Sequence, residues 1–158
     1  MGQITIEYMI MIPVLILQIF LFPLTATIII DNWADSRQTL QLEQVAGHLG
    51  STIQQLYYTV SHASMVNGSM WVKLDVPETI EQHAYSVTLG NVTHQDGSYR
   101  IMNITLRSLS RDISCSTLVT LGDNVNWQNN VSFNSTARNL SLTATKTQNN
   151  IQLTLGGS

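Results

Sequence analysis

The first third of the chain is dominated by one uncharged apolar stretch. No charged residue occurs from Tyr8 to Ile30, a run of 23 residues between two acidic side chains. A helix of about 20 apolar residues crosses a bilayer, and a buried core helix rarely runs this long. The pattern therefore predicts a membrane-competent helix, in which Pro13 and Pro23 are tolerated as they are in membrane helices.

An amphipathic pattern follows the apolar stretch without an intervening loop signal. Apolar positions recur at spacings of three and four, which is the period of one helix face: Leu42, Val45, Leu49, Ile53, Leu56 and Val60. Polar residues occupy a second stripe: Gln41, Gln44, His48, Ser51, Gln55 and His62. We predict one helix from about Gln3 to about Ser64, with Gly47 and Gly50 marking a bend or a close contact.

Beyond residue 64 the pattern changes to short alternating segments rich in Val, Thr, Leu and Ile, which is typical of strands. The candidate strands are residues 71–76, 84–89, 99–108, 116–121, 130–135, 139–147 and 150–155. The predicted fold class is α+β, with one long N-terminal helix packed on a C-terminal all-β antiparallel head at 65–158. The apolar stripe at 42–60 is expected to cover one face of the sheet.

Composition argues against several classes of function. Only 11% of the 158 residues are charged and the net charge is −3, with no basic stripe, so nucleic acid is not an expected partner. Cys115 is the single cysteine and is interpreted as a small buried hydrophobe. The four histidines lack metal-ligand spacing; they are His48, His62, His83 and His94. No catalytic triad or phosphate loop occurs in the sequence. Neither an enzyme nor a metal or organic cofactor is therefore expected.

Six Asn-x-Ser/Thr sequons lie in the head, about twice the number that its composition would give by chance. They are Asn67, Asn91, Asn103, Asn130, Asn134 and Asn139. Asn103 and Asn139 fall on strand faces that the alternation assigns to solvent. We expect N-linked glycans here and therefore a head outside the cell; the alternative is a merely polar, Asn-rich surface.

The N-terminus resembles the class III signal peptide of archaeal type IV pilins. In that family a leader ends in Gly, and the mature chain begins with Gln-x-Ser/Thr-x-Glu-Tyr/Phe before an apolar helix. The matching residues are Gly2, Gln3, Thr5, Glu7 and Tyr8. The resemblance implies cleavage between Gly2 and Gln3, with residues 1–2 as a leader remnant and Glu7 as the fifth residue of the mature chain. The family's leaders usually carry Lys or Arg, whereas this one is only Met-Gly.

The resemblance implies an extracellular adhesion pilus, assembled from copies of this chain through their N-terminal helices. Its implied partners are a membrane prepilin peptidase, an assembly ATPase and a membrane platform protein, and the subunit waits in the membrane before assembly. Glu7, Pro13 and Pro23 are the residues assigned to assembly. The filament-core segment is expected at about 8–30, directly after Glu7. Two alternatives stay open: a single-pass membrane-anchored glycoprotein that does not polymerise, and a minor pilin or archaellum-type filament subunit.

Overall fold

The structure is a computed structural model of the 158-residue chain. It describes the backbone of residues 2–93, 99–127 and 131–156, and the side chains of 9–90, 99–127 and 131–156. The chain forms two compact units, Met1–Arg37 and Gln38–Ser158, which we call the first and second units. Each unit is described by itself below.

One α-helix begins the chain, as the hydrophobic pattern predicts. Helix α1 runs over Gly2–Ser61, and neither Pro13 nor Pro23 interrupts it. The boundary between the two units falls inside this helix, after Arg37. Residues 38–61 therefore belong to the same compact unit as the strands.

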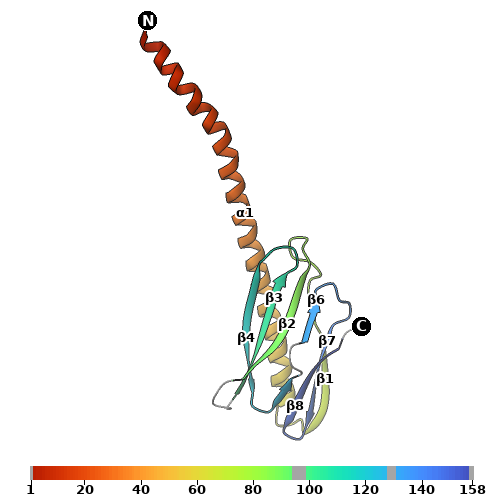
Figure 1. Ribbon diagram of the computed structural model, residues 1–158. Coiled ribbons are helices and arrows are strands. Elements are labelled where there is room, and N and C mark those ends of the chain that lie inside the picture. The colour runs from red at the N-terminus through yellow and green to blue at the C-terminus, as the bar shows by residue number, and fades with distance from the viewer. Residues whose placement is uncertain (1, 94–98, 128–130, 157–158) are drawn as a thin grey trace. The chain divides into compact units, whose positions relative to one another are not determined.

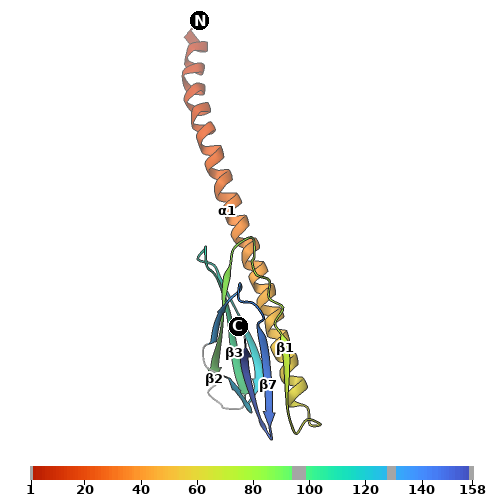
Figure 2. The same ribbon diagram turned by 90° about the vertical axis from the view of Figure 1, so that its right-hand side faces the viewer.

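Eight strands complete the second unit and form two four-stranded sheets. One sheet has the order β1-β7-β8-β5, with strands Asn67–Lys73, Ser141–Thr147, Asn150–Gly156 and Val125–Trp127. The other has the order β4-β3-β2-β6, with strands Ser114–Gly122, Tyr99–Ser108, Tyr85–Thr93 and Val131–Asn134. Figure 1 shows β4, β3 and β2 side by side, and Figure 2 shows the pairing of β1 with β7. The predicted α+β class is confirmed.

The head is not entirely antiparallel, which corrects part of the expectation. The pairing of β5 with β8 is parallel, with Val125 opposite Ile151 and Trp127 opposite Leu153. Every other named strand pair in the described residues is antiparallel. Strand β5 has only three residues, too few for an alternation signal to appear in the sequence.

A single core joins both sheets to one face of α1. Leu42, Leu49, Ile53, Leu56 and Val60 of the predicted stripe are all buried. They share the core with inward-facing residues of both sheets, among them Met102, Ile104, Leu106, Leu142 and Ala144. The prediction that this stripe covers one face of the sheet is therefore confirmed. Val45, the remaining residue of the stripe, is partly buried and packs against the core.

The two helix glycines differ in their surroundings. A Cβ atom added to Gly50 would lie 2.9 Å from Cγ2 of Val119 on β4, closer than ordinary van der Waals contact allows. Gly50 thus marks a close approach of helix and sheet, one of the two roles expected from the sequence. A Cβ atom on Gly47 would meet nothing within 4 Å among the residues described, so this glycine marks no close contact with them.

Helix α1 ends at Ser61, three residues before the predicted end, and a strand side chain binds the carbonyl groups at this end. The ammonium group of Lys146 on β7 donates hydrogen bonds of 3.1 Å to the carbonyl oxygens of Ser61 and His62. A positive charge at this place also complements the helix dipole. The turn is then closed by the backbone N–H of Met65, which donates to the carbonyl oxygen of His62.

Candidate functional site

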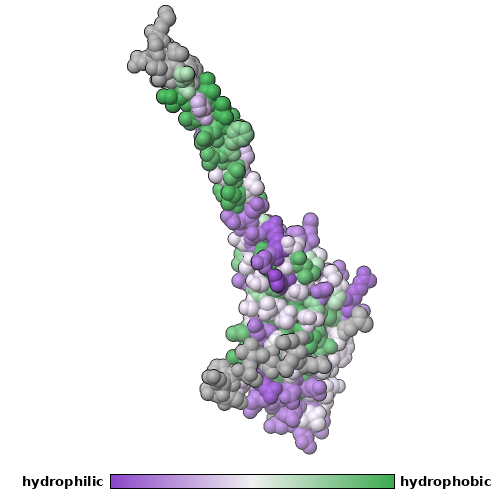
Figure 3. Space-filling model, in the orientation of Figure 1, coloured by the Kyte–Doolittle hydropathy of each residue, from purple (hydrophilic) through white to green (hydrophobic). Residues whose placement is uncertain are grey.

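The candidate site is the apolar surface of the first unit, where the side chains from Met9 to Ile30 are described. The most hydrophobic 18-residue window of this helix has a mean hydropathy of 2.3, and none of it is buried. Large apolar side chains are exposed on all sides, from Met9 at 77% to Ile30 at 64%. Figure 3 shows an almost continuous hydrophobic surface on the visible face of this segment. In length and composition the helix could cross a membrane.

The two threonine hydroxyls inside this stretch are satisfied by the helix itself. The hydroxyl of Thr25 donates to the carbonyl oxygens of Leu21 and Phe22. The hydroxyl of Thr27 donates to the carbonyl oxygen of Pro23. An unsatisfied hydroxyl would be costly in a medium without water. The two threonines therefore do not oppose transfer of the stretch into an apolar environment.

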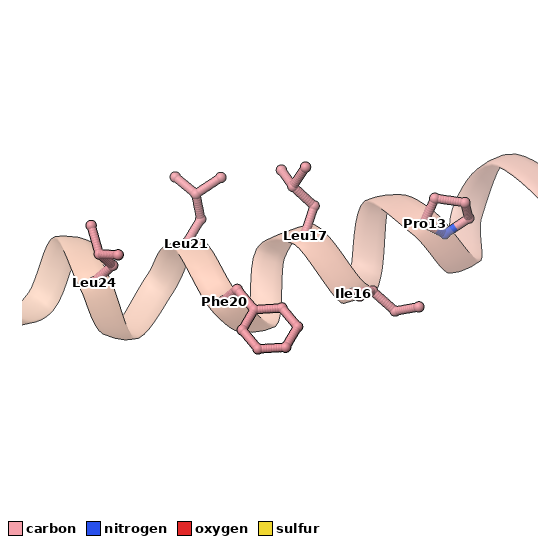
Figure 4. Close-up of a pocket in the computed structure, with 6 residues that line it drawn as sticks. All are labelled: Pro13, Ile16, Leu17, Phe20, Leu21 and Leu24. Carbon is pink, nitrogen blue, oxygen red and sulfur yellow. The ribbon is translucent and has the colours of Figure 1, made fainter.

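The prolines lie between apolar side chains that project in different directions. Figure 4 shows Leu17, Leu21 and Leu24 on one side of the helix, with Ile16 and Phe20 pointing elsewhere. Together with Pro13 they border a shallow open hollow of about 510 Å³. The hollow offers almost no polar atoms for a ligand, and it fits further apolar side chains or lipid chains better than a polar molecule.

A mixed aromatic and charged segment follows the apolar stretch. The guanidinium carbon of Arg37 lies 5.5 Å from the centre of the Trp33 ring, a cation–π geometry. Trp33 is 67% exposed. Trp is enriched where a helix leaves the hydrocarbon region, so this segment has the composition of an interface between an apolar medium and water.

Gly2 and Gln3, which were predicted to be processing residues, and Glu7, which was predicted to act in assembly, lie in α1, but their side chains are outside the described part of the structure. Pro13 and Pro23, the other predicted assembly residues, lie within the exposed apolar stretch. No contact in the described residues brings these positions together with another element. The candidate site is therefore the exposed surface of a single helix and not a pocket.

The described sequons lie in the second unit at different depths. Asn67, Asn134 and Asn139 are exposed, at the start of β1, at the end of β6 and before β7. Asn139 does not lie on a strand face as expected, because its left-handed backbone, with φ of 58°, places it in the preceding turn. Asn91 lies in β2 with an undescribed side chain, and Asn130 is outside the described residues.

Asn103 is the least accessible of the sequons whose side chains are described. It lies on the face of β3 opposite Met102 and Ile104, as the alternation predicts, between Gly90 and Leu118 in the paired strands. Its side chain is half-buried, and its Oδ1 atom is buried without a hydrogen-bond partner in the described structure. A glycan on Nδ2 would have to leave the sheet between its neighbours on β2 and β4.

The second unit holds no constellation that suggests catalysis or metal binding among the residues described. No group of three His, Cys, Asp or Glu side chains could hold a metal ion there, and His94 is outside that set. Desolvation, with a further contribution from the Glu43 carboxylate, raises the pKa of the Cys115 thiol. A thiol with a raised pKa is a poor nucleophile.

Sequence reasoning missed three polar positions that organise this unit. Besides Lys146, buried Gln38 donates a 3.1 Å hydrogen bond to the hydroxyl of Ser108. The hydroxyl of Ser135 accepts from the backbone N–H of Tyr85 and donates to the carbonyl oxygen of Glu78. These partners lie 50 or more residues apart in the chain, so no local pattern could have announced them.

No family model, curated protein or solved structure matches this chain. Its function must therefore be argued from the residues and the structure.

Proposed function

We propose that the chain is the structural subunit of an extracellular, archaeal type IV-like pilus that serves in adhesion. The observation that carries the proposal is the apolar stretch at 9–30, which is exposed on every side although the second unit has a complete core of its own. Burying a large apolar side chain contributes about 1.5–3 kcal/mol. A surface of this size therefore calls for a bilayer, other copies of the helix, or both in succession.

In this proposal the apolar stretch lies first in the bilayer and later among other copies of the helix. Before assembly the apolar stretch spans the membrane, with the sequon-bearing second unit outside the cell and its glycans attached. A prepilin peptidase cuts between Gly2 and Gln3, which leaves the apolar helix on the mature chain. An assembly ATPase and a platform protein then transfer the subunit into a filament, where helices of many copies pack together.

Glu7 distinguishes this proposal from a membrane-anchored glycoprotein that does not polymerise. A membrane-anchored glycoprotein that never polymerises has no need of an acid at the front edge of its apolar helix. In a filament core, an unpaired carboxylate is expensive. The α-amino group created at Gln3 by cleavage offers a partner, on the same or a neighbouring subunit, and such a pair would favour one axial register. A minor pilin or archaellum-type subunit shares this logic, but the mature start of archaellins usually differs from Gln-x-Thr-x-Glu.

The test compares filament yield with membrane level for Glu7→Ala and Glu7→Gln, produced together with the assembly machinery. Both variants are expected to stay in the membrane with a folded second unit, yet to lose most filaments seen by negative-stain microscopy. Glu43→Gln, which changes an exposed acid on the same helix, is the matched control and should assemble normally. Wild-type filament yield from both Glu7 variants would contradict the role in register.

A further inference from the structure

The outward face of β1 carries an exposed aromatic side chain in line with a sequon. Asn67, Ser69, Trp71 and Lys73 alternate on this face and are exposed. Met70 and Val72 point the other way and pack against the core. Trp71 is 69% exposed. The sequon Asn67-Gly68-Ser69 and the indole thus share one face of one strand.

The side chain of Asn67 is held in place by a neighbouring turn. Its Oδ1 atom accepts a 2.8 Å hydrogen bond from the backbone N–H of Gln148. Gln148 has a left-handed backbone, with φ of 57°, in the turn between β7 and β8. A glycan is attached at Nδ2, so this hydrogen bond persists in the modified residue. The bond restricts the direction in which the first sugar leaves the strand.

The spacing along β1 fits a short saccharide. Four residues of a strand span about 13 Å, the length of about two or three pyranose rings. Ser69 lies between the two residues, and its small side chain leaves the path open. Thr145 and Thr143, on the adjacent strand β7, pair with Ser69 and Trp71. A saccharide above β1 would therefore lie on a hydroxyl-lined surface that ends at an indole ring.

We propose that the glycan on Asn67 lies along β1 and stacks the C–H face of one of its sugars on the indole of Trp71. The proposal rests on the glycosylation that belongs to the proposed function, and it adds the place where one glycan is held. Stacking removes apolar surface of both partners from water. Because the glycan is tethered four residues away, the contact forms within one molecule at a high effective concentration.

The other described sequons lack this arrangement. Asn103 and Asn134 belong to the other sheet, on β3 and β6, and Asn139 lies in the turn before β7. Asn134 is exposed, as Asn67 is, and it ends its strand. It therefore serves as the matched control for a glycan that should leave Trp71 unaffected.

The experiment uses the full chain from a glycosylating host, as monomers in detergent. Mass spectrometry of the glycopeptides first measures occupancy at Asn67, and hydroxyl-radical footprinting then measures the oxidation rate of Trp71. Ser69→Ala abolishes the sequon but keeps Asn67 and its hydrogen bond, whereas Ser69→Thr keeps the sequon. Since stacking covers one of two ring faces, Ser69→Ala is expected to raise the Trp71 rate about twofold. Ser69→Thr and Asn134→Gln should leave it unchanged.

Three results would overturn the inference. If Asn67 is unmodified, there is no glycan to stack on Trp71 and the inference fails. If other sequons are modified in the same sample, the glycosylation that belongs to the proposed function still stands. An occupied Asn67 with the same Trp71 rate in wild type and Ser69→Ala would show a glycan that does not stack. The same footprinting can be repeated on assembled filaments. If Trp71 is shielded there but not in monomers, and equally in wild type and Ser69→Ala, another copy of the chain covers the ring.

Discussion

At the scale of single residues, the second unit depends on a few buried polar groups that each have a defined partner. Lys146 is 7% exposed and Gln38 only 3%. Such groups are costly to bury unless their hydrogen bonds are made. Lys146 completes the end of α1, while Gln38 connects the helix to Ser108 at the end of β3. These side chains fix where the elements meet.

Lys146→Met should destabilise the protein by about 1.5–3 kcal/mol, because the carbonyl groups of Ser61 and His62 lose their charged hydrogen-bond donor. Methionine keeps most of the aliphatic stem, so the packing of the side chain changes little. Urea unfolding of the full chain in detergent, followed by tryptophan fluorescence, measures the effect. Lys73→Met on exposed β1 is the control and should change stability by less than about 0.5 kcal/mol. Equal losses for the two variants would contradict the capping role.

Tyr85 should make the second unit sensitive to alkaline pH. Its hydroxyl donates a 2.7 Å hydrogen bond to the carbonyl oxygen of Pro77, and burial raises the pKa of the phenol in the folded state. The unfolded phenol titrates near pH 10. The contribution of Tyr85 is therefore complete below about pH 10 and is lost as the pH rises toward the higher folded pKa.

The measurement is the free energy of unfolding at a series of pH values from 8 to 11, for wild type and Tyr85→Phe. At pH 8 the variant should be about 1 kcal/mol less stable than wild type, because the hydrogen bond is lost. Its stability should then fall less steeply above pH 10. Tyr58→Phe, at an exposed tyrosine of α1, should follow the wild-type pH profile. A Tyr85→Phe profile parallel to wild type would exclude this phenol as the cause.

At the scale of elements, the helix and the long strands could be predicted because their signals are local. The spacing of three and four from Leu42 to Val60 identified the buried face of α1, and the alternation at 99–108 predicted β3 with its bounds. The three-residue strand β5 and its parallel pairing with β8 could not be predicted, since neither leaves a periodic signal. The contact of Lys146 with the end of α1 joins residues 85 positions apart, so no local pattern predicts it.

Leu49→Asp tests the buried face of the helix. Leu49 is 2% exposed, and an unpaired charge at this place costs several kcal/mol after relaxation. We expect loss of the protease-resistant second unit in a limited-proteolysis time course. Leu40→Asp introduces the same side chain at a position of α1 that is 58% exposed, and it should remain resistant. Resistance of both variants would mean that the stripe does not support the fold.

At the scale of the whole molecule, one unit is complete and the other needs surroundings that the chain itself does not provide. Among the residues described, the second unit buries 22 hydrophobic side chains in its core, whereas the most apolar part of α1 is unburied. The length of the uncharged run predicted an apolar helix segment of this kind, whereas the boundary between the two units after Arg37 differs from the predicted boundary after residue 64. The sequence could not predict which apolar environment the helix takes, since lipid chains and neighbouring helices satisfy an apolar surface equally well.

We propose that residues 9–30 become buried among copies of the same helix. Cryo-electron microscopy of filaments sheared from cells that produce the full chain with its assembly machinery tests this claim most directly. The account predicts filaments whose peptides come from this chain, with residues 9–30 of many copies packed along the axis and the strands outside. It would be contradicted by cells that hold the folded, processed protein in the membrane with a working assembly machinery and yet form no filaments, or by filaments in which residues 9–30 face solvent.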